Sequence, residues 1–202
     1  MKVYMLTDQN RMTYNNTLWG ENITHKTSGK GKLCSNGWLH FYYNPHIAVL
    51  LNPIHANIPN PTLWEAKAKG RFRDDHGLKG GCTKLTTIKQ LPLPEITLEQ
   101  KIEFGIRCVM QVCKNKNWLT WANKWLSGED RSQESALAVR NAAYDVAYCD
   151  PYDIVVDATY PVAFYYPSNV AAYSIARAIA RIPDYTEINF DAILKQVFDT
   201  QG

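Results

Sequence analysis

The sequence changes character near Pro94, and this change constrains the fold more than any other feature. Residues 1–95 contain short alternating or β-branched segments between turns rich in Pro and Gly, which is typical of strands. Residues 96–202 are rich in Ala and Tyr, with apolar residues at helical spacing. The charge also changes sign, because residues 1–95 contain 12 Lys and Arg against 6 Asp and Glu, whereas residues 96–202 contain 10 against 13.

These differences predict an α+β protein with two modules. We expect a β-rich module over residues 1–95, with mixed or antiparallel strands and one short helix. We expect an all-α helical bundle over residues 96–202. The 46% of apolar residues in 202 is enough to form a substantial core, in one large domain or two small ones.

Composition also limits the partners and the compartment. A net charge of +3, with Lys and Arg spread along the chain, is too small for non-specific binding to nucleic acid, so no duplex nucleic acid partner is expected. The longest apolar run, residues 47–51, is far shorter than the roughly 20 residues needed to cross a bilayer. The sequence turns polar at Thr7, before a secretory segment is complete. We therefore expect a cytoplasmic protein without a membrane partner.

The five cysteines agree with a reducing compartment. They are odd in number and scattered, without a C-x-x-C pair, so we expect reduced thiols that mostly fill the core.

In the first module, short segments with strand-like patterns alternate with turns. Asn44-Pro45 is a typical helix start, and Asn52-Pro53 is expected to end that helix. Asp74-Asp75-His76-Gly77 is interpreted as a solvated turn, in preference to a general acid and base. Strands are predicted over residues 2–6, 37–43, 64–69 and 83–91, with the strand over 37–43 as a central one, and the helix over 46–51.

In the second module, caps mark the expected helices. Thr97-Leu98-Glu99-Gln100 matches a capping box, and Gly128 is a typical C-terminal stop. Asp130 is a candidate cap for the helix that follows it. The expected helices cover residues 97–114, 118–126, 130–150, the stretch between Pro151 and Pro161, 170–182 and 187–198.

Three tryptophans form the candidate binding site of the helical module. Trp118, Trp121 and Trp125 recur at spacings of three and four, so they share one helix face. Because tryptophan is enriched where proteins bind one another, this face is a candidate docking surface. Burial of the stripe against the first module is the favoured alternative, since so large an exposed aromatic strip is unusual on a monomer.

The sequence assigns no catalytic residue, no metal site and no cofactor. All five histidines lie in the first module, but their spacings match no metal-ligand pattern. His40 is interpreted as a core or boundary histidine.

Two resemblances to known families suggest a biological setting. Residues 33–40 (LCSNGWLH), the segments Asn44-Pro45 and Asn52-Pro53-Ile54-His55-Ala56, Leu63 to Ala66, Asp74 to Lys79 and Leu85 to Pro94 together resemble an uncharacterised family of bacterial and bacteriophage proteins. Residues 104–108, 125–128 and 136–181 are similar to alanine-rich helical domains of the immunity proteins of bacterial toxin systems. The order of elements in the first module also resembles the ADP-ribosyltransferase scaffold.

These resemblances imply a phage or mobile-element protein that acts in the host cytoplasm by binding a host-encoded or element-encoded protein, as an anti-defence inhibitor or immunity-type factor. One alternative is a nucleotide-directed enzyme in the first module, with His40, Tyr42 and Glu65 as the residues to test. A second alternative is a virion or assembly component, and a homo-oligomer is left open.

Overall fold

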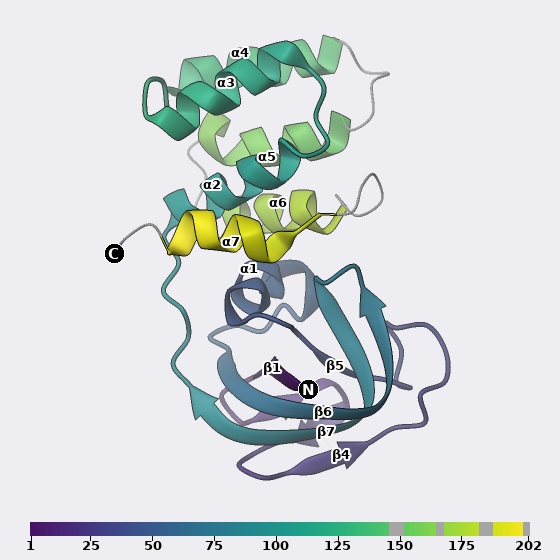
Figure 1. Ribbon diagram of the computed structural model, residues 1–202. Coiled ribbons are helices and arrows are strands. Elements are labelled where there is room, and N and C mark those ends of the chain that lie inside the picture. Colours follow the sequence, from purple (N-terminus) through teal and green to yellow (C-terminus); the bar gives the residue numbers. More distant parts are fainter. Residues whose placement is uncertain (146–151, 165–167, 182–187, 200–202) are drawn as a thin grey trace. The chain divides into compact units, whose positions relative to one another are not determined.

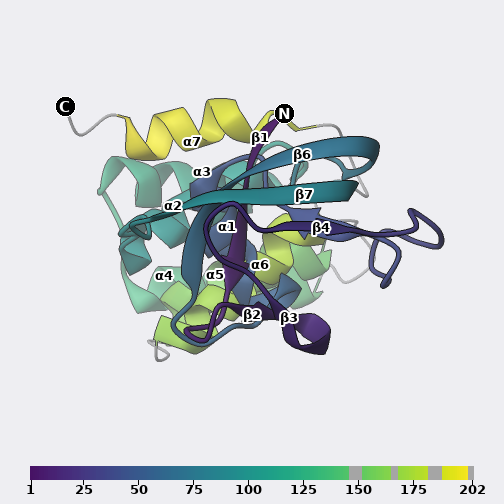
Figure 2. The ribbon, with the colours of Figure 1, turned by 90° about the horizontal axis from the view of Figure 1, so that it is seen from below.

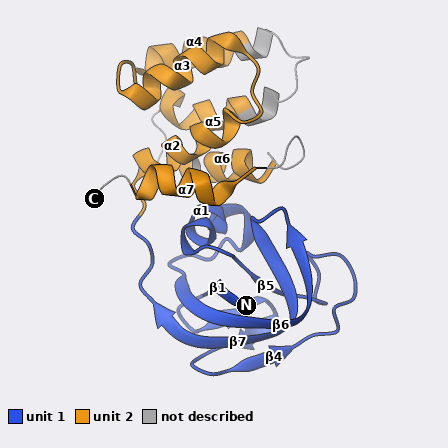
Figure 3. Ribbon diagram, in the orientation of Figure 1, with its two compact units in different colours: residues 1–95 blue, residues 96–202 orange. Residues whose placement is uncertain are grey.

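The chain divides into two compact units at the position where the sequence changes character. The computed structural model describes residues 1–145, 152–164, 168–181 and 188–199. Unit 1 covers residues 1–95 and unit 2 covers residues 96–202 (Figure 3). Every described strand lies in unit 1, and six of the seven described α-helices lie in unit 2, so the predicted α+β class is confirmed.

Four antiparallel strands of unit 1 close into a ring. β1 pairs with β6, β6 pairs with β7, and β7 pairs with β5. The ring closes where Tyr42, just after β5, exchanges two backbone hydrogen bonds of 2.8 and 2.7 Å with Tyr4 of β1. We call this arrangement the strand ring (Figure 1). Its members are β1 (Lys2–Thr7), β5 (Leu39–Phe41), β6 (Thr62–Asp75) and β7 (Lys79–Leu91).

The remaining elements of unit 1 extend the ring. β4 (Thr24–Lys26) pairs with β7 beyond the part that β5 covers, because the long β7 continues past β5. β2 (Met12–Thr13) and β3 (Thr17–Leu18) form a separate hairpin around a 3₁₀ turn, Tyr14–Asn16. The helix α1 (Pro45–His55) packs against β1.

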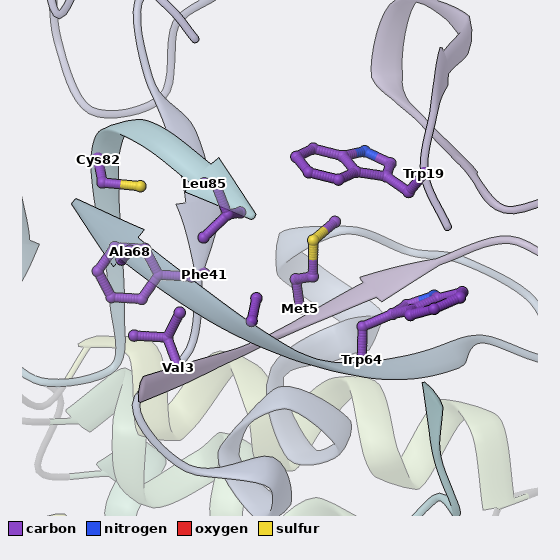
Figure 4. Packing of buried hydrophobic residues seen from close by; sticks show 9 residues of the cluster. Val3, Met5, Trp19, Phe41, Trp64, Ala68, Cys82 and Leu85 are labelled. Carbon is purple, nitrogen blue, oxygen red and sulfur yellow. The ribbon is translucent and has the colours of Figure 1, made fainter. Parts of the chain in front are cut away.

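Side chains from all four strands of the ring form the core of unit 1. Figure 4 shows Val3, Met5, Phe41 and Trp64 converging in the space that the strands enclose. Trp64 also donates a 3.0 Å hydrogen bond from its indole nitrogen to the buried hydroxyl of Thr7, which satisfies its only polar atom. The alternating pattern of residues 64–69 thus predicted the buried face of β6 correctly.

The hairpin between β6 and β7 is tight. His76 and Gly77 both have positive φ, 50° and 81°, and Leu78 donates a 2.9 Å backbone hydrogen bond to Asp75. Two central residues with positive φ are the requirement of the hairpin turns whose twist matches that of the strands. The predicted turn at residues 74–77 is confirmed.

Four predictions for unit 1 are wrong in extent, and two of them concern strands that are longer than predicted: β6 covers Thr62–Asp75 rather than 64–69, and β7 begins at Lys79 rather than at residue 83. α1 does not end at Asn52-Pro53 but runs to His55, with Pro53 inside it. The side chain of Asn52 stabilises this end by two hydrogen bonds to the backbone of Ile58, so a local side-chain cap outweighs the proline signal. The predicted central strand over residues 37–43 is regular only over Leu39–Phe41, although Tyr42 still joins β1.

Unit 2 is a bundle of six helices within the described residues. α5 packs against α4 and α6, α2 packs against α5, α6 and α7, and α3 packs against α4. None of the helices in the described ranges is both long and apolar enough to cross a membrane. The helices are α2 (Leu98–Val109), α3 (Lys116–Ser127), α4 (Gln133–Asp145), α5 (Tyr152–Phe164), α6 (Ser168–Arg181) and α7 (Phe190–Phe198).

The helix ends of unit 2 follow the predicted caps in part. The capping box of Thr97 and Gln100 is confirmed, and Gly128 ends α3 in the left-handed conformation, with φ 77°. Asp130 does not itself cap α4. It accepts hydrogen bonds from the backbone nitrogen and hydroxyl of Ser132, and the Ser132 hydroxyl accepts from the Ser135 nitrogen.

Several helix boundaries differ from the prediction, including the start of α4, which lies at Gln133 rather than at residue 130. α2 ends at Val109 rather than near residue 114, and Pro161 lies inside α5 instead of ending it. α7 begins after Asn189, whose side chain accepts a hydrogen bond from the Ala192 nitrogen. The predicted ends at residues 150 and 182 lie outside the described residues.

Candidate functional site

The tryptophan stripe does not form an exposed docking face. Trp118, Trp121 and Trp125 retain 0, 5 and 3% of their surface, and α3 packs against α4. The shared face was predicted correctly, and its burial agrees with the favoured interpretation over an exposed docking face, because the stripe supplies apolar area that the bundle buries. Burial of this stripe against the first module stays a prediction.

Polar contacts hold the end of the stripe in place. Arg131 lies over the Trp125 ring at 4.5 Å and donates a 2.9 Å hydrogen bond to the Trp125 carbonyl. The same guanidinium pairs with Glu99 at the start of α2. The indole nitrogens of Trp118 and Trp121 have no hydrogen-bond partner among the described residues. This stripe is therefore core.

The three residues of the enzymatic alternative share one face of the sheet without meeting. Tyr42 lies opposite Tyr4, and Tyr4 lies opposite Glu65, so the Tyr4 side chain stands between the other two. Glu65 forms a 3.1 Å ion pair with Lys2. His40, two residues from Tyr42, is exposed and makes a 2.5 Å hydrogen bond to the Leu33 carbonyl.

Ionisable groups gather instead around Lys79. Lys79 is the first residue of β7, just before Gly80 and Gly81. These two glycines pair with Phe41 and His40 of β5. The Lys79 ammonium lies 3.2 Å from the exposed Cys34 thiol and 3.8 Å from the Asp75 carboxylate. The cluster of Cys34, His40, His55 and Lys79 therefore combines a thiol, two imidazoles and a cation, which we call the Lys79 cluster.

The electrostatics of this cluster disfavour protonation of its imidazoles. Burial lowers the pKa of His55 to about 3, and the nearby Lys79 ammonium and His40 ring add to this effect. Partial desolvation by the surrounding protein lowers the pKa of His40 even though its side chain reaches the surface, and Lys79 adds to this effect, against the opposing hydrogen bond to Leu33. His55 stacks on Tyr42 with ring centroids 6.0 Å apart, and its Nδ1 has no hydrogen-bond partner within the part of the chain that the structure describes.

The described residues contain no group of three or more His, Cys, Asp or Glu side chains arranged to hold a metal ion.

An open apolar pocket of about 610 Å³ lies at one end of the strand ring. Phe72 forms part of its wall and is 46% exposed, although its ring also contacts the core residue Phe41 edge to face at 6.4 Å. We call this the Phe72 pocket. Its lining residues are Met1, Tyr43, Ala68, Lys69, Gly70 and Phe72.

Three lysines lie in one row on the outer face of the sheet. Lys84 of β7 pairs with Lys26 of β4 on one side and with Lys69 of β6 on the other. Figure 2 shows these three strands side by side. We call Lys26, Lys84 and Lys69 the lysine row. The expectation that basic residues are spread evenly is therefore wrong for this face of unit 1.

Sequence reasoning missed both the Phe72 pocket and the lysine row. The alternation of residues 64–69 placed Lys67 and Lys69 on the wet face, but Lys26 and Lys84 joined them only through strand register. Phe72 follows a bulge between Lys69 and Phe72 that shifts the register, so no simple alternation predicts its direction.

Comparisons with known proteins identify no relative: no protein-family model, no curated protein and no solved structure matches this chain.

Proposed function

We propose that this chain is a phage or mobile-element accessory protein that acts by binding another protein, as an anti-defence inhibitor or immunity-type factor does. The family resemblances of the two modules give the biological setting. The observation that carries the binding role is the Phe72 pocket, which is open and predominantly apolar in its lining. An apolar side chain of a partner would enter this pocket and remove the exposed part of Phe72 from water.

The half-exposed Phe72 is the main support for this proposal. Apolar area exposed beside an apolar hollow is a typical anchor point for a binding partner, because the buried area stabilises the complex. Phe72 is already held on one side by Phe41, so little side-chain entropy remains to be lost on binding.

The test is capture of a stoichiometric partner from host cells by the full chain, followed by binding measurements with the purified partner. We expect Phe72→Ser to weaken binding at least about tenfold, since it removes a central apolar contact. Tyr14→Ser is the matched control, because Tyr14 is 80% exposed and does not line the pocket. The absence of a stoichiometric partner, or equal binding by both variants, contradicts the proposal.

The two alternatives stay predictions with tests of their own. An NAD-directed activity of unit 1 predicts NAD turnover that is lost in Glu65→Gln. A role in virion assembly predicts a symmetric oligomer of the purified chain.

A further inference from the structure

The lysine row places like charges opposite one another on three neighbouring strands. Directly paired residues on one face of a sheet have their Cβ atoms about 5 Å apart, and like charges at such positions destabilise the sheet. Lys26 and Lys69 are exposed, and Lys84 between them is half-buried. Lys67, two residues before Lys69 on the same strand, adds a further cation to this face.

The fold leaves these charges uncompensated. None of the lysines in the row forms an ion pair with any described residue, whereas Lys2 and Lys79 at other places in unit 1 are paired with Glu65 and Asp75. Solvated surfaces usually intersperse both signs of charge. The row therefore differs from an ordinary wet sheet face.

Protection of a sheet edge explains only part of the row. Lysines on edge strands hinder pairing with other chains, and Lys26 lies on the edge strand β4. Lys84, however, is paired on both sides, with Lys26 of β4 and Lys69 of β6, so it has no edge to protect. Lys69 lies beyond Lys67, the last β6 residue that β1 pairs, so edge protection accounts for Lys26 and Lys69 but not for Lys84. A ligand that supplies negative charge accounts for all three.

The row is continuous with the Phe72 pocket, because Lys69 belongs to both. On this basis we infer that unit 1 binds an acidic segment of a partner protein, with one apolar anchor residue in the Phe72 pocket and carboxylates along the lysine row. This inference rests on the proposed function and names the chemistry of the partner.

An acidic protein segment fits these observations better than a single-stranded nucleic acid. Proteins that bind single strands present aromatic faces on which successive bases stack. Here Phe72 is the one exposed aromatic residue of the pocket lining, beside the half-buried Tyr43, and a hollow of this kind suits a single anchor side chain rather than a row of stacked bases. The lysine row then supplies the electrostatic complementarity that fixes the segment's direction.

The experiment uses the full chain and synthetic probes. The principal probe is an amidated peptide with one leucine followed by six glutamates, titrated at low salt and followed by amide NMR shifts. Three matched probes replace the leucine by serine, replace the glutamates by glutamines, or consist of oligo(dT) with the same number of negative charges. We expect the acidic, leucine-bearing peptide to bind most tightly and to shift the amides of Lys69, Phe72 and Lys84.

The variants distinguish binding by the lysine row from an effect of the net charge of the whole chain. Lys26→Gln, Lys69→Gln and Lys84→Gln together should raise the Kd of this peptide at least about fivefold, as expected for three surface contacts. The arginine triple variant at the same positions should restore binding. The control is Lys114→Gln, Lys116→Gln and Lys195→Gln in unit 2, which removes the same charge from exposed positions and should leave the Kd unchanged within about twofold.

Several results would overturn the inference. The first is that the glutamine peptide binds as tightly as the acidic peptide, and the second is that the unit 2 control loses as much affinity as the lysine-row variant. The third is that oligo(dT) binds more tightly than the acidic peptide. The fourth is self-association of the chain that the lysine-row variant abolishes, since a second copy would then be the occupant. If the captured partner depends on Phe72 but not on the lysine row, the proposed function stands and this inference fails. If no partner depends on Phe72, the proposed function fails and this inference fails with it, and binding of the acidic peptide then shows an anion-binding surface on unit 1 alone.

Discussion

The neutral imidazole of His55 makes unit 1 sensitive to mild acid. In the folded chain the pKa of His55 is about 3, against an ordinary value of 6.5. As the pH falls, His55 of the unfolded chain therefore binds a proton near pH 6.5, whereas His55 of the folded chain binds one only near pH 3. The stability that comes from neutral His55 is fully present above pH 6.5 and is lost progressively as the pH falls towards 3.

The magnitude follows from this difference. At 1.36 kcal/mol for each pH unit, the loss between pH 7 and pH 5 is about 2 kcal/mol of the free energy of unfolding of unit 1. His55→Phe keeps a ring against Tyr42 while removing both the titration and the unpaired Nδ1, so we expect its stability to change much less over the same range. The difference between the two proteins isolates His55 from the carboxylates that titrate in both.

Hydrogen exchange of the full chain at pH 7 and pH 5 measures this effect. The free energies of opening of the β1 and β6 amides, corrected for the intrinsic exchange rates, report on unit 1 alone. Equal losses of stability in the natural chain and in His55→Phe between these two pH values would refute the assignment of a buried neutral imidazole.

Three further predictions concern the fold and the thiols. Trp118→Ala should lower the free energy of unfolding of unit 2 by about 3–5 kcal/mol in urea, because a fully buried indole is lost. Trp118→Phe should cost less, since it keeps a ring and the indole nitrogen has no hydrogen-bond partner to lose among the described residues. Equal costs for the two variants would contradict this account. Iodoacetamide at pH 8 should alkylate Cys34 first among the described cysteines, as mapped by mass spectrometry. Cys34 is exposed, whereas burial raises the pKa of Cys82 to about 11 and also raises the pKa values of Cys108 and Cys113, so early labelling of these three would be evidence against the packing. Gly37→Ala should destabilise unit 1 by more than Gly77→Ala, because a Cβ at Gly37 would lie 1.8 Å from the Lys30 carbonyl oxygen whereas Gly77 faces open space. Gly77→Ala should cost about 1 kcal/mol because Gly77 has a positive φ. The reverse order of urea midpoints would contradict the close contact between Gly37 and Lys30.

Local signals determined a large part of the architecture. The capping box at Thr97, the glycine stop at Gly128 and the turn at residues 74–77 depend on a few neighbouring residues, so the sequence alone predicts them. The α+β class follows from the same kind of information, because helical and alternating periodicities are properties of short windows. Where two local signals compete, as Pro53 and the Asn52 side chain do at the end of α1, the sequence predicted the wrong end.

The candidate site depends on contacts between distant residues, which no local window contains. Lys26, Lys69 and Lys84 are spread along 59 positions, and only the pairing of β4, β7 and β6 aligns them. Cys34 meets Lys79 across 45 positions in the same way. The indole face of α3 was visible in the sequence, but whether that face meets water or other helices is decided by the packing of the bundle, because an apolar stripe serves a core and an interface equally well.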